Sequence, residues 1–255
     1  MKASHWFPRL AACVLGVGLL SLPAAAAAAD LSFDGGSLTL GQGHGGALAG
    51  PVKIILLLTA LSFAPALLIA ATSFTRIIIV LSMLRQAIGM TNTPPNPVLI
   101  SLALFLTLFT MAPVISAVDE AAVQPYLAGK LEDKPALVAA QVPIRKFLVR
   151  QTRESDLKLV IELSGKPKPE SVDDVGLFTL IPAFMLSELR IGFEIGFVIF
   201  LPFVLIDLVV ASVLMSLGMI MVPPLAISLP LKILVFILID GWSLVTEVLV
   251  RSFQA

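Results

Sequence analysis

The sequence predicts an all-α membrane protein of kinked helices and broken helical hairpins with a charged helical insert, and three observations favour this fold class. Hydrophobic residues make up 58% of the 255 residues and charged residues 13%, whereas soluble domains are near half apolar and a quarter charged. Residues 54–75 and 98–118 contain no charged residue, and each run is long enough to cross a bilayer as a helix. Prolines and isolated charges interrupt the apolar sequence after Val175, which predicts short helices packed against protein neighbours.

The first 29 residues follow the order of a secretory signal peptide. Two basic residues precede the apolar run of residues 10–22, and a block of alanines follows it, as in an n-region, an h-region and a small-residue cleavage site. Cleavage near Ala28 or Ala29 removes the only cysteine, which excludes disulfides and thiol chemistry in the mature chain. The alternative is that residues 10–22 stay as a membrane anchor, although this run is short for a span.

Residues 30–50 and 51–118 are expected to differ in character. The first segment is polar and rich in glycine, and it is expected to be a disordered leader because it has too few apolar groups to form a core. The second segment is expected to hold the N-terminal membrane helices. Pro65 should kink the first of them, because its ring removes a backbone donor and clashes one turn back. The proline-rich residues 93–97 predict a turn before the next helix.

The charged residues set the expected orientation. Nine basic and ten acidic residues fall in residues 119–174 and predict a charged extracytoplasmic insert of short helices. If the amino end is exported, two spans place Arg76 and Arg85 on the cytoplasmic side, as the positive-inside rule favours. The basic residues of the insert run against that rule, which is weak for long loops. The chain has no net charge, so no overall field attracts nucleic acid.

Residues 175–255 are expected to form C-terminal helical hairpins and subunit contacts. Central charges in lipid cost about 3 kcal/mol each on insertion scales, so those in this half should face protein or water. Arg190 and Glu194 are four residues apart and share a helix face, and Glu247 and Arg251 repeat the spacing. The candidates for polar contacts between helices are Glu188, Arg190, Glu194, Asp207 and Lys232.

Asp207 and Lys232 are not expected to pair in a simple hairpin. They lie at unequal distances from the turn expected at residues 223–230, so hairpin pairing would not align them, and if they pair, the partner is expected in another subunit or on a bent helix. The alternative for all of these charges is that they are satisfied packing charges with no role in transport.

The sequence offers little for catalysis or for cofactor binding. Metal sites need clusters of His, Cys or carboxylates, and a Ser or Thr nucleophile needs a base held against it. Neither arrangement is evident, so no enzyme activity, cofactor or metal is expected. Carboxylates within apolar sequence keep an ion or small-solute transporter as an alternative, and they are Glu188, Glu194, Asp207 and Asp240.

Three methionines, Met215, Met219 and Met221, cluster before Pro223. Their unbranched, polarizable side chains fill irregular gaps and can repack around different surfaces. In a ring of subunits they would make a deformable seal, whereas a plain core stripe is the alternative.

Two sets of motifs occur in order along the chain. The first set is Thr72-Ser73-Phe74-Thr75-Arg76, Leu84-Arg85-Gln86-Ala87, Thr93-Pro94-Pro95-Asn96 and Leu102-Ala103-Leu104-Phe105-Leu106. The second set is Ser187-Glu188-Leu189, Phe193-Glu194-Ile195-Gly196-Phe197, Leu205-Ile206-Asp207, Met219-Ile220-Met221-Val222-Pro223-Pro224, Ser228-Leu229-Pro230-Leu231-Lys232 and Asp240-Gly241-Trp242. Together they resemble the FliP family of flagellar biosynthetic proteins, which includes the SctR subunits of virulence injectisomes.

The resemblance implies a core pore subunit of the flagellar type III export gate. Several copies would form a helical ring with FliQ-like and FliR-like membrane subunits and other export-gate proteins, in the inner membrane at the flagellar basal body. Unfolded flagellar subunits would pass through this ring. The signal peptide and the insert favour the flagellar branch, and the virulence injectisome is the alternative.

The resemblance also implies a pore gasket at Met219, Ile220 and Met221. Many relatives have a third methionine where this chain has Ile220, and this difference slightly weakens the expected seal.

Overall fold

The computed structural model describes residues 58–59, 61–63, 66, 69–165, 171, 174–219 and 221–254. Nearly all of them belong to one compact unit that begins at Phe63. The predicted signal peptide with Ala28 and Ala29, the leader, the proposed kink at Pro65 and most of the first apolar run lie outside the described residues.

Over the described ranges the unit is all-helical, without a strand, as the sequence predicts. The helices in order are α4 (Phe74–Ile88), α5 (Asn96–Val118), the π-helical segment η1 (Asp119–Val123), α6 (Gln124–Leu127), α7 (Asp133–Gln151), α8 (Glu154–Leu163), α9 (Leu177–Ser216), α10 (Pro224–Leu238) and α11 (Gly241–Arg251).

Two helical segments are long and apolar enough to cross a membrane, Asn96–Leu127 and Leu177–Ser216. Helices α10 and α11 together pass the same test, but they meet at a bend of 65°. They would make a third span if the bent pair crosses as one unit.

Helix α4 ends before the proline-rich turn that the sequence predicts. Gly89 caps it with a φ of 92°, a left-handed conformation that costs glycine little because it has no Cβ. The proline-rich turn follows, and α5 begins after Pro95.

The helix that starts with α5 does not end at Asp119, the expected border of the insert. It continues through η1 and α6 to Leu127, and the Asp119 carboxylate accepts a hydrogen bond of 2.8 Å from Gln124 Nε2. The backbone becomes π-helical at the first acidic residues and then α-helical again, so these residues mark a change of chemistry along one continuing helix.

Only α9 departs from the short helices predicted for the C-terminal half, since α10 and α11 are short and meet at a bend. Helix α9 runs without a break for 40 residues and contains Pro182 and Pro202. The prediction was wrong because it treated each charge as a point where the helix had to stop. Other segments of the chain pair these charges, so the helix continues past them.

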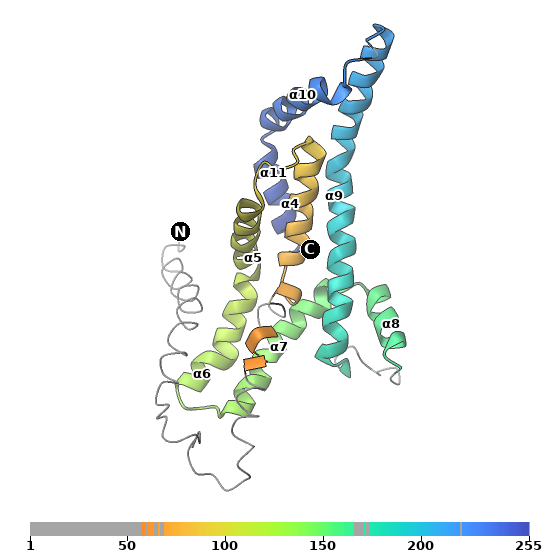
Figure 1. Ribbon diagram of the computed structural model, residues 1–255. Coiled ribbons are helices and arrows are strands. Elements are labelled where there is room, and N and C mark those ends of the chain that lie inside the picture. Colours follow the sequence, from red (N-terminus) through yellow and green to blue (C-terminus); the bar gives the residue numbers. More distant parts are fainter. Residues whose placement is uncertain are drawn as a thin grey trace, which may run out of the picture. The chain divides into compact units, whose positions relative to one another are not determined.

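Helix α4 packs against α9 at the centre of the unit, with α5 on another side of α4 and with α7 and α8 also against α9 (Figure 1). The close approach of α4 depends on Gly192 and Gly196, one helical turn apart on α9. A Cβ at Gly192 would lie 3.3 Å from Ile79, and one at Gly196 would overlap Met83. This spacing of small residues lets two helices pack closely.

The bend between α10 and α11 depends on a second close approach. Asp240 has a φ of 50°, and Gly241 lies directly against the ring of Phe236. That ring packs between Phe203 and Trp242, with ring centroids 6.4 Å and 5.4 Å away. The ring therefore has little room to move.

Replacing Gly241 by alanine should destabilise the protein, because the added Cβ would overlap Phe236. Overpacking of this kind costs about 1–3 kcal/mol. Thermal unfolding of the purified protein in detergent measures the loss. Gly176→Ala is the matched control, since its Cβ would meet nothing within 4 Å, and equal melting temperatures for the two variants would contradict the prediction.

Candidate functional site

A buried ion pair joins α4 to α9. The side chains of Arg76 and Glu188 are 1% and 0% exposed. Arg76 Nε donates to Glu188 Oε2 at 2.9 Å, and Nη2 donates to Oε1. This bidentate arrangement is the strongest that a guanidinium and a carboxylate adopt.

Three other residues complete the surroundings of the Arg76 guanidinium. Its Nη1 donates to the backbone oxygen and the hydroxyl of Ser252, both at 3.0 Å, and Nη2 donates to Gln151 Oε1 at 3.0 Å. The Phe253 ring centroid lies 3.9 Å from Arg76 Cζ. All five N–H donors of the guanidinium thus have acceptors, and the buried cation is fully satisfied. We call these five residues the Arg76 network.

A second polar cluster lies where α8 meets α9. Ser187 Oγ donates to Asp156 Oδ2 at 2.8 Å and accepts from the backbone N–H of Arg153 at 3.0 Å. Arg190 Nη2 lies 3.3 Å from Asp156 Oδ1, and Arg153 Nη1 lies 2.7 Å from Glu194 Oε1.

The pairing of Arg190 with Glu194, expected from their spacing, is therefore replaced by two pairs with residues near the start of α8. The prediction considered one helix alone. Helix α8 packs against α9 and brings charges of opposite sign to both residues.

Asp207 and Lys232 pair within the chain, contrary to expectation. Lys232 Nζ donates to Asp207 Oδ2 at 2.6 Å and to the backbone oxygen of Ala87 at 3.2 Å. The prediction failed because it extended the turn to Pro230, which lies inside α10. The turn comes between α9 and α10, so the two residues lie at similar distances from it and face each other across a hairpin.

Arg76 and Arg85 occupy different surroundings. Arg76 is buried in its network and is no exposed surface charge, whereas Arg85 is half-buried and donates from Nη1 to Pro94 O at 3.1 Å and to Asn96 Oδ1 at 2.7 Å. Sequence reasoning missed the roles of Gln151 and Ser252. The sequence gives one sign that Arg76 has a partner. Arg76 lies among apolar residues of α4, and a cation in such surroundings needs an anion beside it.

The tip between α9 and α10 carries two of the three predicted gasket residues. Met219 is 41% exposed and Met221 is 97% exposed, while Ile220 lies outside the described residues. Gly218 has a φ of 73°, which turns the chain at the end of α9. Both methionine side chains therefore project from the single chain.

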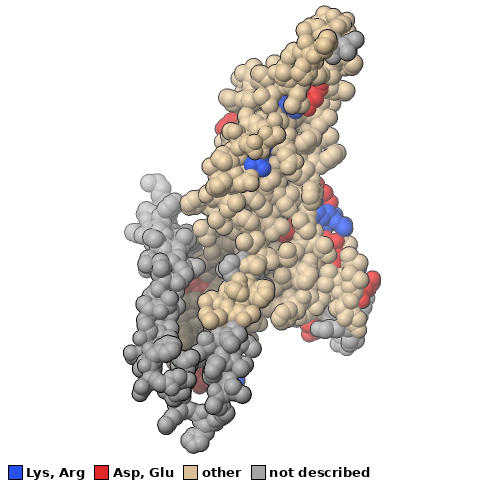
Figure 2. Space-filling view, viewed as in Figure 1, with Lys and Arg blue, Asp and Glu red and all other residues tan. Residues whose placement is uncertain are grey.

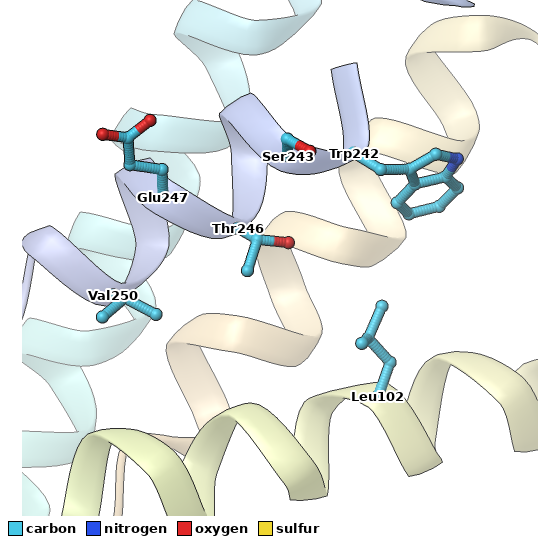
Figure 3. Close-up of a pocket in the computed structure, with 6 residues that line it drawn as sticks. All are labelled: Leu102, Trp242, Ser243, Thr246, Glu247 and Val250. Carbon is cyan, nitrogen blue, oxygen red and sulfur yellow. The ribbon is translucent and has the colours of Figure 1, made fainter. Parts of the chain in front are cut away.

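A broad, open pocket of about 600 Å³ lies between α5 and α11 (Figure 3). Leu102 projects into it from α5, and Trp242, Thr246 and Val250 line it from α11. The Glu247 carboxylate at its edge pairs with Arg251 at 2.5 Å, the four-residue pairing that the sequence predicts. Among the residues with described positions, no group of three or more His, Cys, Asp or Glu could hold a metal ion.

On the face shown in Figure 2 the surface over α9 and α10 is largely uncharged except for small acidic and basic patches, and more charged side chains lie nearer to α8. Large hydrophobic residues are exposed along the whole of α9. They include Phe178, Phe193, Phe197, Val198, Leu205, Leu208, Val209 and Met215.

The sequence that forms this arrangement matches a known protein family. A family model described as the FliP family matches residues 57–249. The chain belongs to the FliP family. The match extends from before α4 into α11, and so contains the Arg76–Glu188 ion pair, the Asp207–Lys232 pair and the tip.

Curated relatives carry the name flagellar biosynthetic protein FliP. The FliP of Bacillus subtilis (strain 168) is 51% identical over 202 residues, which cover 79% of this chain and 91% of the relative. The FliP of Caulobacter vibrioides is 48% identical over 227 residues, 89% of this chain and 85% of the relative. The FliP of Aquifex aeolicus is 43% identical over 219 residues, which cover 85% of this chain and 90% of the relative. The family resemblance of the sequence motifs is thus confirmed.

Replacing Arg76 by methionine should destabilise the protein by about 3–5 kcal/mol, because Glu188 would remain buried without its partner. The double variant Arg76→Met/Glu188→Leu should recover part of this loss, since it buries no charge. Thermal unfolding in detergent measures both effects.

The control for this comparison is Glu247→Gln, which breaks an exposed pair worth about 1 kcal/mol or less. An Arg76→Met protein that melts at the same temperature as Glu247→Gln would show that the buried pair does not stabilise the fold.

Proposed function

We propose that this chain is a core pore subunit of the flagellar type III export gate, through which unfolded flagellar subunits cross the inner membrane. The observation that supports this proposal is the chemistry of α9. Its charged residues Glu188, Arg190, Glu194 and Asp207 all pair within the chain, and apart from the paired Arg190 and Glu194 most of the surface exposed along the helix is apolar. Such a surface needs lipid or protein neighbours.

The partners follow from this surface and from the family. Several copies of the chain assemble side by side through their apolar helix faces, together with FliQ-like and FliR-like membrane subunits and other export-gate proteins. The central polar contacts remain inside each copy. Exposed apolar faces then form the contacts between copies, where aromatic residues such as Phe193 and Phe197 supply large buried areas.

The proposed location is the inner membrane at the flagellar basal body. Helices α7 and α8 form the extracytoplasmic insert, with Arg85 toward the cytoplasmic side. Since both insert helices pack on α9, the insert is a part of the ring wall. This orientation agrees with a cleaved signal peptide, which delivers the amino end outward.

The tip residues Met219, Ile220 and Met221 form the gasket of the closed pore. The exposure of Met219 and Met221 in the single chain leaves their side chains available for contacts across a ring. Thioether side chains repack readily around different surfaces, so a ring of them would seal against ions and still yield to a passing chain.

A transporter function has less support. Proton or ion relay within a membrane needs carboxylates that can take up and release the ion, and three of the four candidates are held in ion pairs, namely Glu188, Glu194 and Asp207. The named relatives are all flagellar biosynthetic proteins, which favours the flagellar gate over the injectisome.

The pore proposal predicts a multi-subunit assembly. Purification of the tagged chain from its own membranes in mild detergent should yield a ring with FliQ-like and FliR-like subunits, measured by native mass spectrometry. A stable monomer or dimer that binds a small solute would contradict the proposal and favour the transporter.

The gasket proposal predicts a leak. Replacing Met219 and Met221 together by alanine should raise ion leakage across the membrane without preventing assembly, because alanine leaves the closed pore unfilled. The ion leakage is measured as the conductance of the assembled gate in planar bilayers. Leu137→Ala with Val138→Ala, two exposed apolar residues of α7, is the control, and a leak no greater than in this control would remove the gasket.

A further inference from the structure

A second, narrower pocket contains a cation without an anion. It has a volume of about 160 Å³ and lies between the C-terminal end of α4, the loop before α5 and the α10–α11 bend. Its walls are largely apolar and include Ile88, Ile233, Ile237 and Trp242. Arg85 is the charged residue among the described residues that line it. We call it the Arg85 pocket.

The guanidinium of Arg85 is held in place but not neutralised. Its Nη1 is bound by the oxygens of Pro94 and Asn96, neither of which carries a charge. Its Nε is buried and has no hydrogen-bond acceptor, and in the part of the chain that the structure describes no ion pair includes Arg85. The cations of Arg76 and Lys232 have carboxylate partners close by, so Arg85 differs from both.

An unpaired cation beside apolar walls is costly unless an anion approaches it. Guanidinium groups bind phosphate oxygens with paired, charge-assisted hydrogen bonds. The loop contacts already fix the Arg85 side chain, so little further entropy is lost when an anion binds. The chemistry of the Arg85 pocket therefore favours a phosphate group.

The surroundings of the pocket favour a lipid as the source of this phosphate. Ile237, which lines the pocket, is 68% exposed, and the next residue of α10, Leu238, is 74% exposed, so apolar surface lies beside the pocket. Trp242 lies at the same pocket, and tryptophan is enriched where membrane meets water. A charged head next to an apolar strip is the pattern that a phospholipid presents.

We propose that the Arg85 pocket binds the phosphate group of a membrane glycerophospholipid, with Arg85 as the phosphate ligand. The acyl chains lie outside the pocket along the exposed face of α10. The pocket is of the size of a phosphate group with its neighbouring atoms and is too small for a whole lipid. The lipid would then occupy the bend between α10 and α11 and fill the space beside Trp242.

Native mass spectrometry of the assembled protein, delipidated in mild detergent and titrated with phosphatidylglycerol, tests this proposal. Arg85→Gln should weaken the saturable binding by about tenfold or more, because charge-assisted hydrogen bonds are lost. Arg251→Gln is the matched control, since it removes an exposed arginine of the neighbouring α11, and it should leave the binding unchanged.

A second variant separates binding from folding. Ile237→Trp fills the pocket from an exposed position and leaves the contacts of Arg85 with Pro94 and Asn96 in place. It should reduce phosphatidylglycerol binding at an unchanged melting temperature. Equal binding by the unmodified protein, Arg85→Gln and Ile237→Trp would overturn the proposal.

Two further ligands distinguish the source of the binding. Diacylglycerol has the same chains without a phosphate and should bind at least tenfold more weakly than phosphatidylglycerol, so equal binding would show an apolar groove only. Inorganic phosphate alone should not displace the lipid at millimolar concentration. Displacement by phosphate would assign the pocket to a free anion and overturn the lipid proposal.

Discussion

The rest of the fold depends on the buried ion pair between Arg76 and Glu188. Two further segments complete the guanidinium's contacts, one through Gln151 of α7 and one through Ser252 after α11. Four parts of the chain that are far apart in sequence therefore meet around one side chain. A buried charge that loses its partner costs several kcal/mol. Moving α4 or α9 out of place would therefore destabilise the fold by several kcal/mol.

The same principle explains the exposed surface. The charged residues of α9 are paired with neighbouring segments: the buried Glu188 with α4, Asp207 with α10, and the more exposed Arg190 and Glu194 with residues near the start of α8. These four pairs join α9 to three neighbours, α4, α10 and the α8 region. The paired charges of α9 thus hold the helices of this chain together, and its large apolar side chains remain exposed on the surface.

Local patterns predicted the fold well where a single segment decides the outcome. The end of α4 at Gly89, the start of α5 after the proline-rich turn and the Glu247–Arg251 pair follow from glycine, from proline and from four-residue spacing. Prediction failed where distant segments decide. The continuity of α9, the pairing of Arg190 and Glu194 with the α8 region and the place of Gln151 depend on contacts that no local pattern contains. The pairing of Asp207 with Lys232 was not predicted because the turn was expected to extend to Pro230, whereas Pro230 lies inside α10.

The length of α9 sets a limit on where the protein can reside. At 1.5 Å per residue, its 40 residues extend about 60 Å, roughly twice the hydrocarbon thickness of a bilayer. Even a tilt of about 40° leaves much of the helix beyond the acyl chains, although most of its exposed surface is apolar. A bilayer can therefore cover only part of the apolar surface of α9, and the rest of that surface needs protein neighbours to keep it from water.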